Sequence, residues 1–253
     1  MEKLRLYTFL FILISISACK KDAPEAVPEE QEATAFAEQI SFEMNGKKYS
    51  SDVRSGSGRG NRQINIKPYT NPFSGRRYEY QTGGYFWYGE KDSTLFDTFY
   101  NFSSRKELIS IKISFSKKFH NDQLRKSLNL IIPIDKLDLF KEGKQTFAVD
   151  LDKENTTEGV ALSLNIIYEQ EFKTLTSYMP GFTILIRPEM NKDIQQNSNF
   201  EITKVQKIDD NRIFVQAKFE LNLFDEEGTL YRAENGFVEF KTSIKMENAV
   251  DMY

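Results

Sequence analysis

The chain has 253 residues, of which 40% are hydrophobic, enough for one large β domain or two small domains. Its 34 basic and 37 acidic residues are interspersed and give a formal charge of −3, so no strong positive field exists and nucleic acid is excluded as an expected partner. The 21 phenylalanines and 12 tyrosines favour β-strands over helices.

The first 18 residues have the pattern of a signal peptide. Lys3 and Arg5 precede an apolar stretch at residues 6–16, which is too short to span a bilayer comfortably. The motif ISAC at residues 16–19 then resembles the lipobox of bacterial lipoprotein precursors. The resemblance implies cleavage before Cys19 and lipidation of its sulfur and its new amino terminus.

Cys19 is the only cysteine, so the chain has no pair with which to form a disulfide. A plain signal peptide followed by a free thiol is the alternative. Several acyl chains on one residue attach a protein firmly, because each buried methylene contributes about 0.8 kcal/mol. We therefore expect the mature protein to lie on a membrane, attached through its N-terminal lipid, without crossing it.

The residues after Cys19 indicate which membrane. In bacterial lipoproteins generally, Asp directly after the lipidated cysteine favours the inner membrane, whereas Lys20 and Lys21 stand here. The stretch KKDAPEAVPEEQE, residues 20–32, is similar to the tether that directs lipoproteins of Bacteroidetes-type bacteria to the cell surface. The resemblance implies an outer-membrane location with display on the outward face.

The composition also divides the chain into segments. Residues 19–39 comprise the lipidated cysteine and an acidic, Pro-containing stretch that is poor in large apolar residues, which predicts a flexible tether. Residues 40–246 are predicted to form a single domain, and residues 247–253 a C-terminal tail.

Period-two alternation and turn residues predict many short strands within this domain. The clearest signal is ISFEMNGKKYSSD, residues 40–52, which turns at Asn45-Gly46, a pair suited to tight hairpins. Further strands are predicted at residues 62–69, 107–119, 159–172, 181–188, 199–208, 212–224 and 236–246. Helical periodicity is confined to residues 121–130 and 135–140.

These elements predict an all-β fold. The strands do not alternate with long helices, so an antiparallel β-sandwich with one or two short helices is expected, and a jelly-roll or barrel-like arrangement is the alternative.

The two ends of the domain resemble the β-rich domain of Bacteroidetes-type outer-membrane and surface lipoproteins of uncharacterised function. In that family an opening strand runs into an Asn-Gly-Lys turn, and the last strand is entered through Asn-Gly-x-Phe. The matching positions are Asn45, Gly46, Lys47, Tyr49, Phe219, Gly228, Asn235, Gly236 and Phe237. The resemblance implies a fold and a location, and it implies no chemistry.

Segments that suggest catalysis or metal binding have simpler interpretations. His120, the only histidine, lies in a polar stretch and is expected to be solvated. SGSGRGN, residues 55–61, is expected to be a flexible hairpin loop, because no helix follows to bind a phosphate. Residues 150–159 have alternate acidic oxygens but lack the turn glycine of a calcium loop. No catalytic residue, metal site or cofactor is predicted.

An aromatic stretch, RRYEYQTGGYFWYGEKD at residues 76–92, is the candidate ligand-binding surface. Aromatic rings stack on the faces of sugars, and neighbouring arginines supply hydrogen bonds. The candidate residues are Arg76, Arg77, Tyr85, Trp87 and Tyr88. A structural strand buried on one face and covered by a loop on the other is the competing interpretation.

The sequence thus favours a lipid-anchored, non-enzymatic binding or structural protein of the cell envelope, with a glycan or a protein as its partner. The alternative is a glycan-processing hydrolase that uses carboxylates, although no pair among the 37 acidic residues is singled out.

Overall fold

A computed structural model describes residues 36–62, 69–70, 77–78, 80–82, 85–87, 93–104, 108–127, 130–151, 157–168, 171–179 and 192–245. The chain divides into two compact units, Met1–Ala35 and Phe36–Tyr253. The predicted signal peptide and Cys19 lie outside the described residues. Within the described ranges, no helix has the length and apolar character needed to cross a bilayer.

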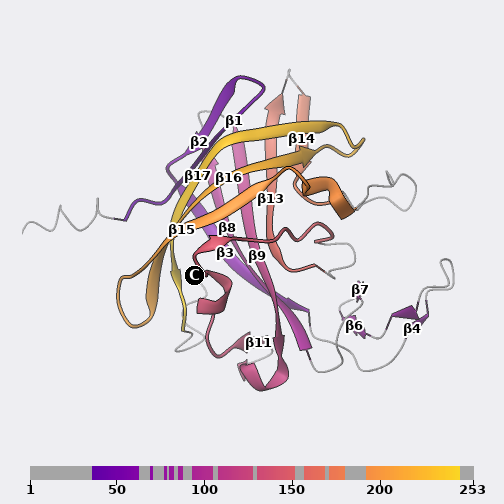
Figure 1. Ribbon diagram of the computed structural model, residues 1–253, viewed down its shortest axis with the longest axis vertical. Coiled ribbons are helices and arrows are strands. Elements are labelled where there is room, and N and C mark those ends of the chain that lie inside the picture. Colours follow the sequence, from indigo (N-terminus) through magenta and orange to yellow (C-terminus); the bar gives the residue numbers. More distant parts are fainter. Residues whose placement is uncertain are drawn as a thin grey trace, which may run out of the picture. The chain divides into compact units, whose positions relative to one another are not determined.

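Strands dominate the second unit, as the sequence predicts (Figure 1). The strands are β1 Gln39–Met44, β2 Lys47–Ser51, β3 Arg54–Arg62, β4 Tyr69–Thr70, β5 Arg77–Tyr78, β6 Tyr80–Thr82, β7 Tyr85–Trp87, β8 Ser93–Ser104, β9 Ile109–His120, β10 Leu124–Ser127, β11 Leu130–Pro133, β12 Gly143–Lys144, β13 Gly159–Tyr168, β14 Glu171–Thr176, β15 Asn199–Lys207, β16 Arg212–Phe224 and β17 Leu230–Ser243. Three short 3₁₀ helices are described, η1 Asn121–Gln123, η2 Leu137–Leu139 and η3 Lys192–Gln195.

Eleven of these strands form one antiparallel sheet. Its main path runs β2-β1-β17-β16-β14-β13-β9-β8-β3, and β15 pairs with both β16 and β12. Among the described strands, no pairing closes the sheet into a barrel. The predicted all-β, antiparallel sandwich class is confirmed.

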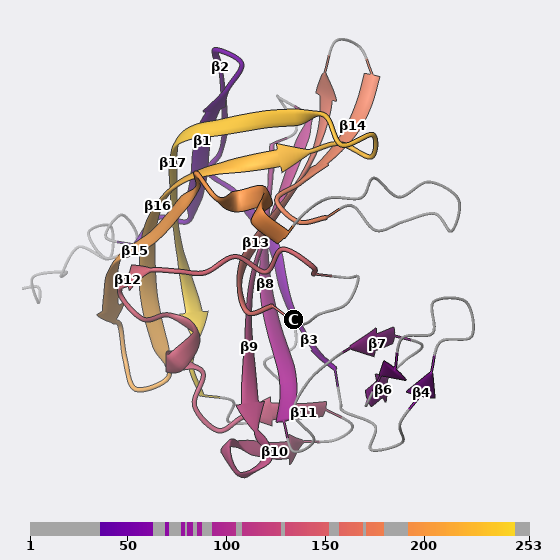
Figure 2. The ribbon, with the colours of Figure 1, turned by 45° about the vertical axis from the view of Figure 1, so that its right-hand side comes forward.

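The sheet folds into two layers where β16 meets β14, because a single residue pair, Thr176 with Phe224, joins those strands. One layer contains β1, β2, β12 and β15–β17, and the other contains β3, β8, β9, β13 and β14 (Figures 1 and 2). Their inner faces pack together: the rings of Tyr100 and Phe240 stack at 4.2 Å, and those of Phe115 and Phe200 lie 6.0 Å apart. Burying each such side chain stabilises the fold by about 1.5–3 kcal/mol.

The two outermost strands, β2 and β3, follow each other in the chain and are separated by Asp52 and Val53 alone. The Ser103 amide donates to the Val53 carbonyl at 3.1 Å. The Ser51 hydroxyl donates to the Ser103 carbonyl at 2.9 Å. The two edges of the sheet therefore meet at this link, although no continuous ladder joins them.

The predicted hairpin at Asn45-Gly46 is confirmed. These two residues connect β1 to β2, with Met44 paired to Lys47. Both have positive φ, 51° for Asn45 and 72° for Gly46, which is the conformation that a two-residue hairpin turn requires.

The second Asn-Gly pair has a different role from the predicted one. The last strand begins at Leu230, so Asn235 and Gly236 lie inside β17 and do not lead into it. The register with β16 shifts between Phe219 and Leu221, which marks a β-bulge, and Asn235 has φ of 52° within it. Gly236 pairs with Phe219, whose ring occupies the space that a side chain at 236 would need.

Two other sequence predictions are wrong. Residues 55–61 lie within β3 and do not form a loop. The strand tolerates glycine because the Phe99 ring lies over Gly58, 2.4 Å from the position of an added Cβ. Residues 121–130 contain η1 and the strand β10 in place of a helix, with β10 paired to β11. The predicted helical segment at residues 135–140 corresponds to η2.

Candidate functional site

A cavity of about 250 Å³ lies beside β9, at the point where β13 begins. The β13–β9 ladder starts at Gly159, which pairs with Ser116, whereas β9 continues to His120. Among the described residues, no strand pairs with the end of β9 on this side. There the Glu158 carboxylate accepts a hydrogen bond from the Lys118 amide at 2.7 Å, where a strand would supply a carbonyl.

Gly159 lines this cavity and packs closely against the backbone of Thr146. Its φ is 128°, and an added Cβ would lie 2.1 Å from the Thr146 carbonyl oxygen. The close approach lets the Val160 amide donate to that oxygen at 2.8 Å, and lets the Ala148 amide donate to the Val160 carbonyl at 3.0 Å. A glycine is required here both by its backbone conformation and by the space available.

Charged side chains from three segments line the cavity. The basic residues are Lys117, Lys141 and Lys144, and the acidic residues are Asp138, Glu142 and Glu158. Asp138 lies between two ammonium groups, at 3.0 Å from Lys141 Nζ and 3.8 Å from Lys117 Nζ. The hydrogen bond from Lys141 lowers the pKa of Asp138, and the charge of Lys117 adds to this effect against the cost of burial.

The other two carboxylates bind the backbone. Glu142 accepts the Val205 amide at 2.8 Å, just beyond the two residues of β12 that pair with β15. Glu158 accepts the Lys118 amide in the same manner. Both side chains therefore cap strand edges that no neighbouring strand covers at these positions.

A buried hydroxyl belongs to the same wall. Ser116 is 4% exposed, and among the described residues its Oγ has no hydrogen-bond partner. Such groups are uncommon in folded proteins, and each one suggests an unseen partner or a functional role. The cavity thus combines ammonium groups, carboxylates and a hydroxyl, which suits a small polar ligand that makes many hydrogen bonds.

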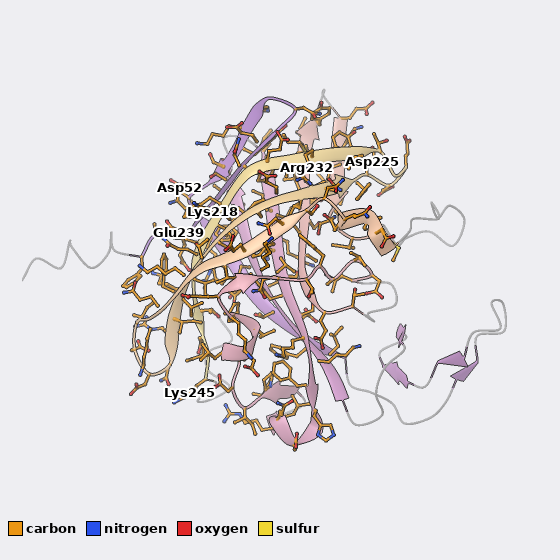
Figure 3. All side chains as sticks on the ribbon, in the orientation of Figure 1. Asp52, Lys218, Asp225, Arg232, Glu239 and Lys245 are labelled. Atoms are coloured by element: carbon orange, nitrogen blue, oxygen red, sulfur yellow. The ribbon has the colours of Figure 1, made fainter. Side chains whose placement is uncertain are left out.

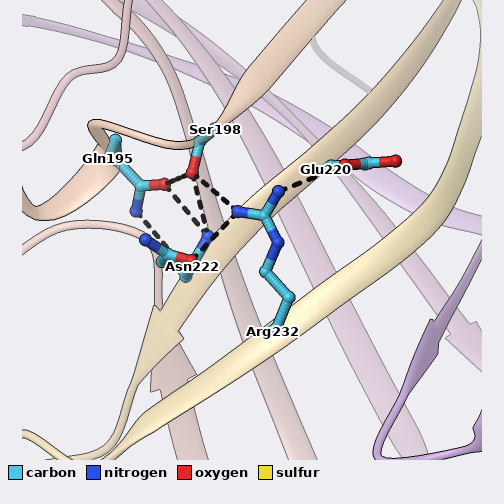
Figure 4. A network of polar contacts seen from close by, with 5 residues as sticks. All are labelled: Gln195, Ser198, Glu220, Asn222 and Arg232. Carbon is cyan, nitrogen blue, oxygen red and sulfur yellow. Dashed lines mark hydrogen bonds and ion pairs between the residues drawn. The ribbon is translucent and has the colours of Figure 1, made fainter.

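Two further polar clusters have structural roles. In the first, Gln195, Ser198 and Arg232 surround Asn222 and join the turn after η3 to β16 and β17 (Figure 4). Arg232 also donates to Glu220 at 3.2 Å. The donors and acceptors of this network satisfy one another, so its role is structural: it holds these segments together.

In the second cluster, Asp225 organises the β16–β17 turn. Its Oδ1 accepts the amides of Glu227 and Thr229 at 3.1 and 2.8 Å. Lys173 of the other layer donates to the Tyr231 hydroxyl at 3.1 Å and lies 3.9 Å from Asp225. Figure 3 labels Asp225 at this turn and Lys245 beyond the far end of β17. This cluster connects the two layers near the β13–β14 hairpin.

The structure gives partial information on the residues predicted from sequence. Arg76 and Tyr88 lie outside the described residues. The backbone of Arg77 belongs to β5, and those of Tyr85 and Trp87 to β7, where Trp87 pairs with Tyr80. Residues 85–87 thus form a strand, whereas the competing interpretation of a strand buried on one face stays a prediction. The aromatic ligand site stays a prediction.

His120 is the last residue of β9 and is exposed, with its Nδ1 2.9 Å from Asp122 Oδ1. Asp150 is buried and accepts the Thr157 amide at 3.0 Å, so the ends of the calcium-like segment are joined directly. In the described ranges, no cluster of histidine, cysteine or acidic side chains has the arrangement of a metal site.

Sequence reasoning did not find the cavity. Its lining comes from three separated segments, and the one signal at residue level was Gly159, a glycine at the start of a strand. Comparisons of this chain with models of known protein families, with curated proteins and with solved structures find no match.

Proposed function

We propose that this chain is a lipid-anchored, non-enzymatic binding protein of the bacterial outer membrane, whose β-sandwich binds a small polar ligand. The anchor rests on ISAC at residues 16–19, which follows an apolar stretch and contains the only cysteine. The binding role rests on one structural observation, the charged cavity beside the end of β9.

The state of the cavity carboxylates supports binding over hydrolysis. A glycosidase of the common type needs one carboxylic acid with a raised pKa that protonates the leaving group. The pKa of Asp138 is lowered instead, chiefly by its hydrogen bond with Lys141. Glu142 and Glu158 accept hydrogen bonds from the backbone amides of Val205 and Lys118, so both carboxylates are already engaged in holding the fold.

Cell fractionation tests the anchor. The substitution Cys19→Ala removes the lipidation site and is expected to move the protein from the membrane fraction to the soluble fraction. Lys218→Ala, a change at an exposed position of β16, is the control and is expected to stay with the membrane. Equal membrane retention of the Cys19→Ala and wild-type proteins would refute the anchor.

An array of oligosaccharides tests binding by the folded unit. Lys117→Met keeps the aliphatic stem but removes one of the three ammonium groups of the cavity, whereas Trp87→Ala changes the aromatic stretch. Loss of glycan binding in Lys117→Met alone assigns the ligand to the cavity, and loss in Trp87→Ala alone assigns it to the aromatic site. Turnover of any oligosaccharide would overturn the non-enzymatic proposal.

A further inference from the structure

Exposed apolar side chains are concentrated at one end of the layer that contains β9, β13 and β14. Ile167 and Phe172 are paired across β13 and β14 and are 46% and 73% exposed. Strands β13 and β9 pair Asn165 with Ser110. Continuing this antiparallel register by two residues places Leu108 opposite Ile167, and Leu108 is 62% exposed. These three residues form one row, which we call the apolar rim.

Leu108 suggests that exposure of the rim is not incidental. Its φ is 52°, in the left-handed region where glycine and asparagine are favoured and a leucine is strained. The side chain contributes little to the core because it is largely exposed. A residue suited to turn stability alone would be small and polar, so an exposed leucine at this φ is consistent with a contact that requires an apolar group.

The rows next to the rim are polar but carry almost no charge. On the same face, the next two rows are Val53, Ser103, Ser110, Asn165 and Thr174, followed by Asn101, Lys112, Ser163 and Thr176. Among these described positions none is acidic, and the single charge is that of Lys112. Val53 adds a fourth exposed apolar side chain, at 55%. These two rows carry no acidic side chain, and together with the apolar residues beside them they are compatible with a phospholipid surface.

The dimensions fit a shallow insertion. Residues two apart in a strand are separated by about 6.6–6.8 Å, so the polar rows begin roughly 7 Å behind the rim. An interfacial element typically buries its apolar groups about 5–10 Å into the boundary between headgroups and acyl chains. With the rim at the depth of the acyl chains, the Ser, Thr and Asn rows would lie at the depth of the headgroups.

The start of the folded unit lies next to this face. Glu38 forms an ion pair with Arg54 at 2.5 Å, and Arg54 directly follows Val53. From Cys19 to Phe36 the chain has 17 peptide bonds, 36 minus 19. Fully extended, this segment spans at most about 60 Å, so a lipid on Cys19 keeps the rim within reach of the same bilayer.

We propose that the apolar rim of Leu108, Ile167 and Phe172 contacts the phospholipid surface to which Cys19 is anchored, and thereby orients the sandwich on the membrane. This inference rests on the proposed lipid anchor. Attachment through one end of the chain raises the local concentration of lipid, so a small apolar contact suffices.

The test uses the full-length lipidated protein in vesicles of zwitterionic and anionic phospholipid. Because lipidation consumes the Cys19 sulfur, Phe172→Cys supplies a unique thiol for an environment-sensitive dye. We expect the dye to lose emission when vesicle lipids carry a nitroxide on the acyl chain. The matched control is Lys218→Cys, an exposed position on the other layer, whose dye is expected to keep its emission (Figure 3).

The outcomes separate the inference from the anchor. A protein that does not float with the vesicles refutes the anchor, and with it the orientation proposed here. A protein that floats but shows equal, weak quenching at positions 172 and 218 refutes the rim contact alone. The dye at position 172 is also followed in a sample without lipid. A change in its emission there would indicate that a second copy or another protein contacts the rim, and would also overturn the proposal.

A second variant checks the same contact without a dye on the tested residue. The double change Ile167→Glu and Phe172→Glu, combined with dye-labelled Leu108→Cys, is expected to abolish quenching while flotation persists. Ile134→Glu, at a 54% exposed position outside the rim, is expected to leave quenching unchanged. Persistent quenching in the double variant would contradict the assignment.

Discussion

Adding one methyl group at Gly236 is expected to destabilise the folded unit. A Cβ at this position would lie 2.3 Å from the Phe219 ring, whereas ordinary contact begins at 3.4 Å, a shortfall of 1.1 Å. The ring has little room to withdraw, because it stacks on Phe200 at 5.8 Å with the rings 10° from parallel. Forcing such an overlap typically costs about 1–3 kcal/mol.

The cost should reverse when the ring is removed. Phe219→Ala alone leaves a cavity and is expected to cost about 3–5 kcal/mol. In that background Gly236→Ala meets no ring, and the methyl group restricts the unfolded chain, so the second change is expected to stabilise by about 0.5–1 kcal/mol. The control is Gly56→Ala, since the nearest atom to its added Cβ is Asn101 Nδ2 at 3.9 Å.

Equilibrium unfolding in urea measures all four proteins of this cycle, with circular dichroism as the signal. We expect a coupling between positions 219 and 236 of about 2 kcal/mol. Additive effects of the two changes would refute the argument that the ring excludes a side chain at position 236. Destabilisation by Gly56→Ala equal to that of Gly236→Ala would also refute it, because loss of glycine would then matter more than the contact.

Three further predictions concern polar groups. Asp225→Ala removes the acceptor for two turn amides and is expected to lower the free energy of unfolding in urea by about 1–2 kcal/mol. Asp225→Asn keeps an acceptor oxygen and should lower it less, so equal losses of stability in the two variants would contradict this role. Lys141→Ala is expected to raise the pKa of Asp138, and NMR titration of the carboxyl group measures it; an unchanged titration would disprove the pairing. Because the pKa of Asp138 is lowered in the folded state, this carboxylate stabilises the fold at pH values above its ordinary pKa of 3.8, and the contribution is lost as the pH falls through the folded pKa. Gly159→Ala is expected to cost about 3 kcal/mol or more, because it combines an unfavourable φ with a backbone clash, and a thermal midpoint equal to that of wild type would rule this out.

The sequence predicted those strands that alternate clearly or end in specific turn residues. Strands β9, β15 and β16 lie where alternation placed them, and Asn45-Gly46 specified its hairpin. Local patterns failed where a distant segment decides the structure. Residues 55–61 lack large apolar side chains of their own and become a strand because Phe99 of β8 covers Gly58.

Other differences have similar causes. The pattern at residues 159–172 suggested one strand, but β13 ends at Tyr168 and β14 begins at Glu171, since both faces of the hairpin carry apolar residues. Strand β8 was not predicted, because Leu95 and Phe96 are adjacent and both buried, which breaks the alternation. The cavity was beyond sequence reasoning, because its charged side chains come from segments up to 41 residues apart, from Lys117 to Glu158.

Because β2 and β3 follow each other in the chain, one short stretch of residues supplies the strands at both edges of the sheet. Residues 39–62 cover the open side of β17 through β1 and the open side of β8 through β3. A proteolytic nick that released this stretch would uncover two long rows of amides and carbonyls in a single event. Such uncovered rows template edge-to-edge polymerisation, so an intact stretch at residues 39–62 protects the sheet against it.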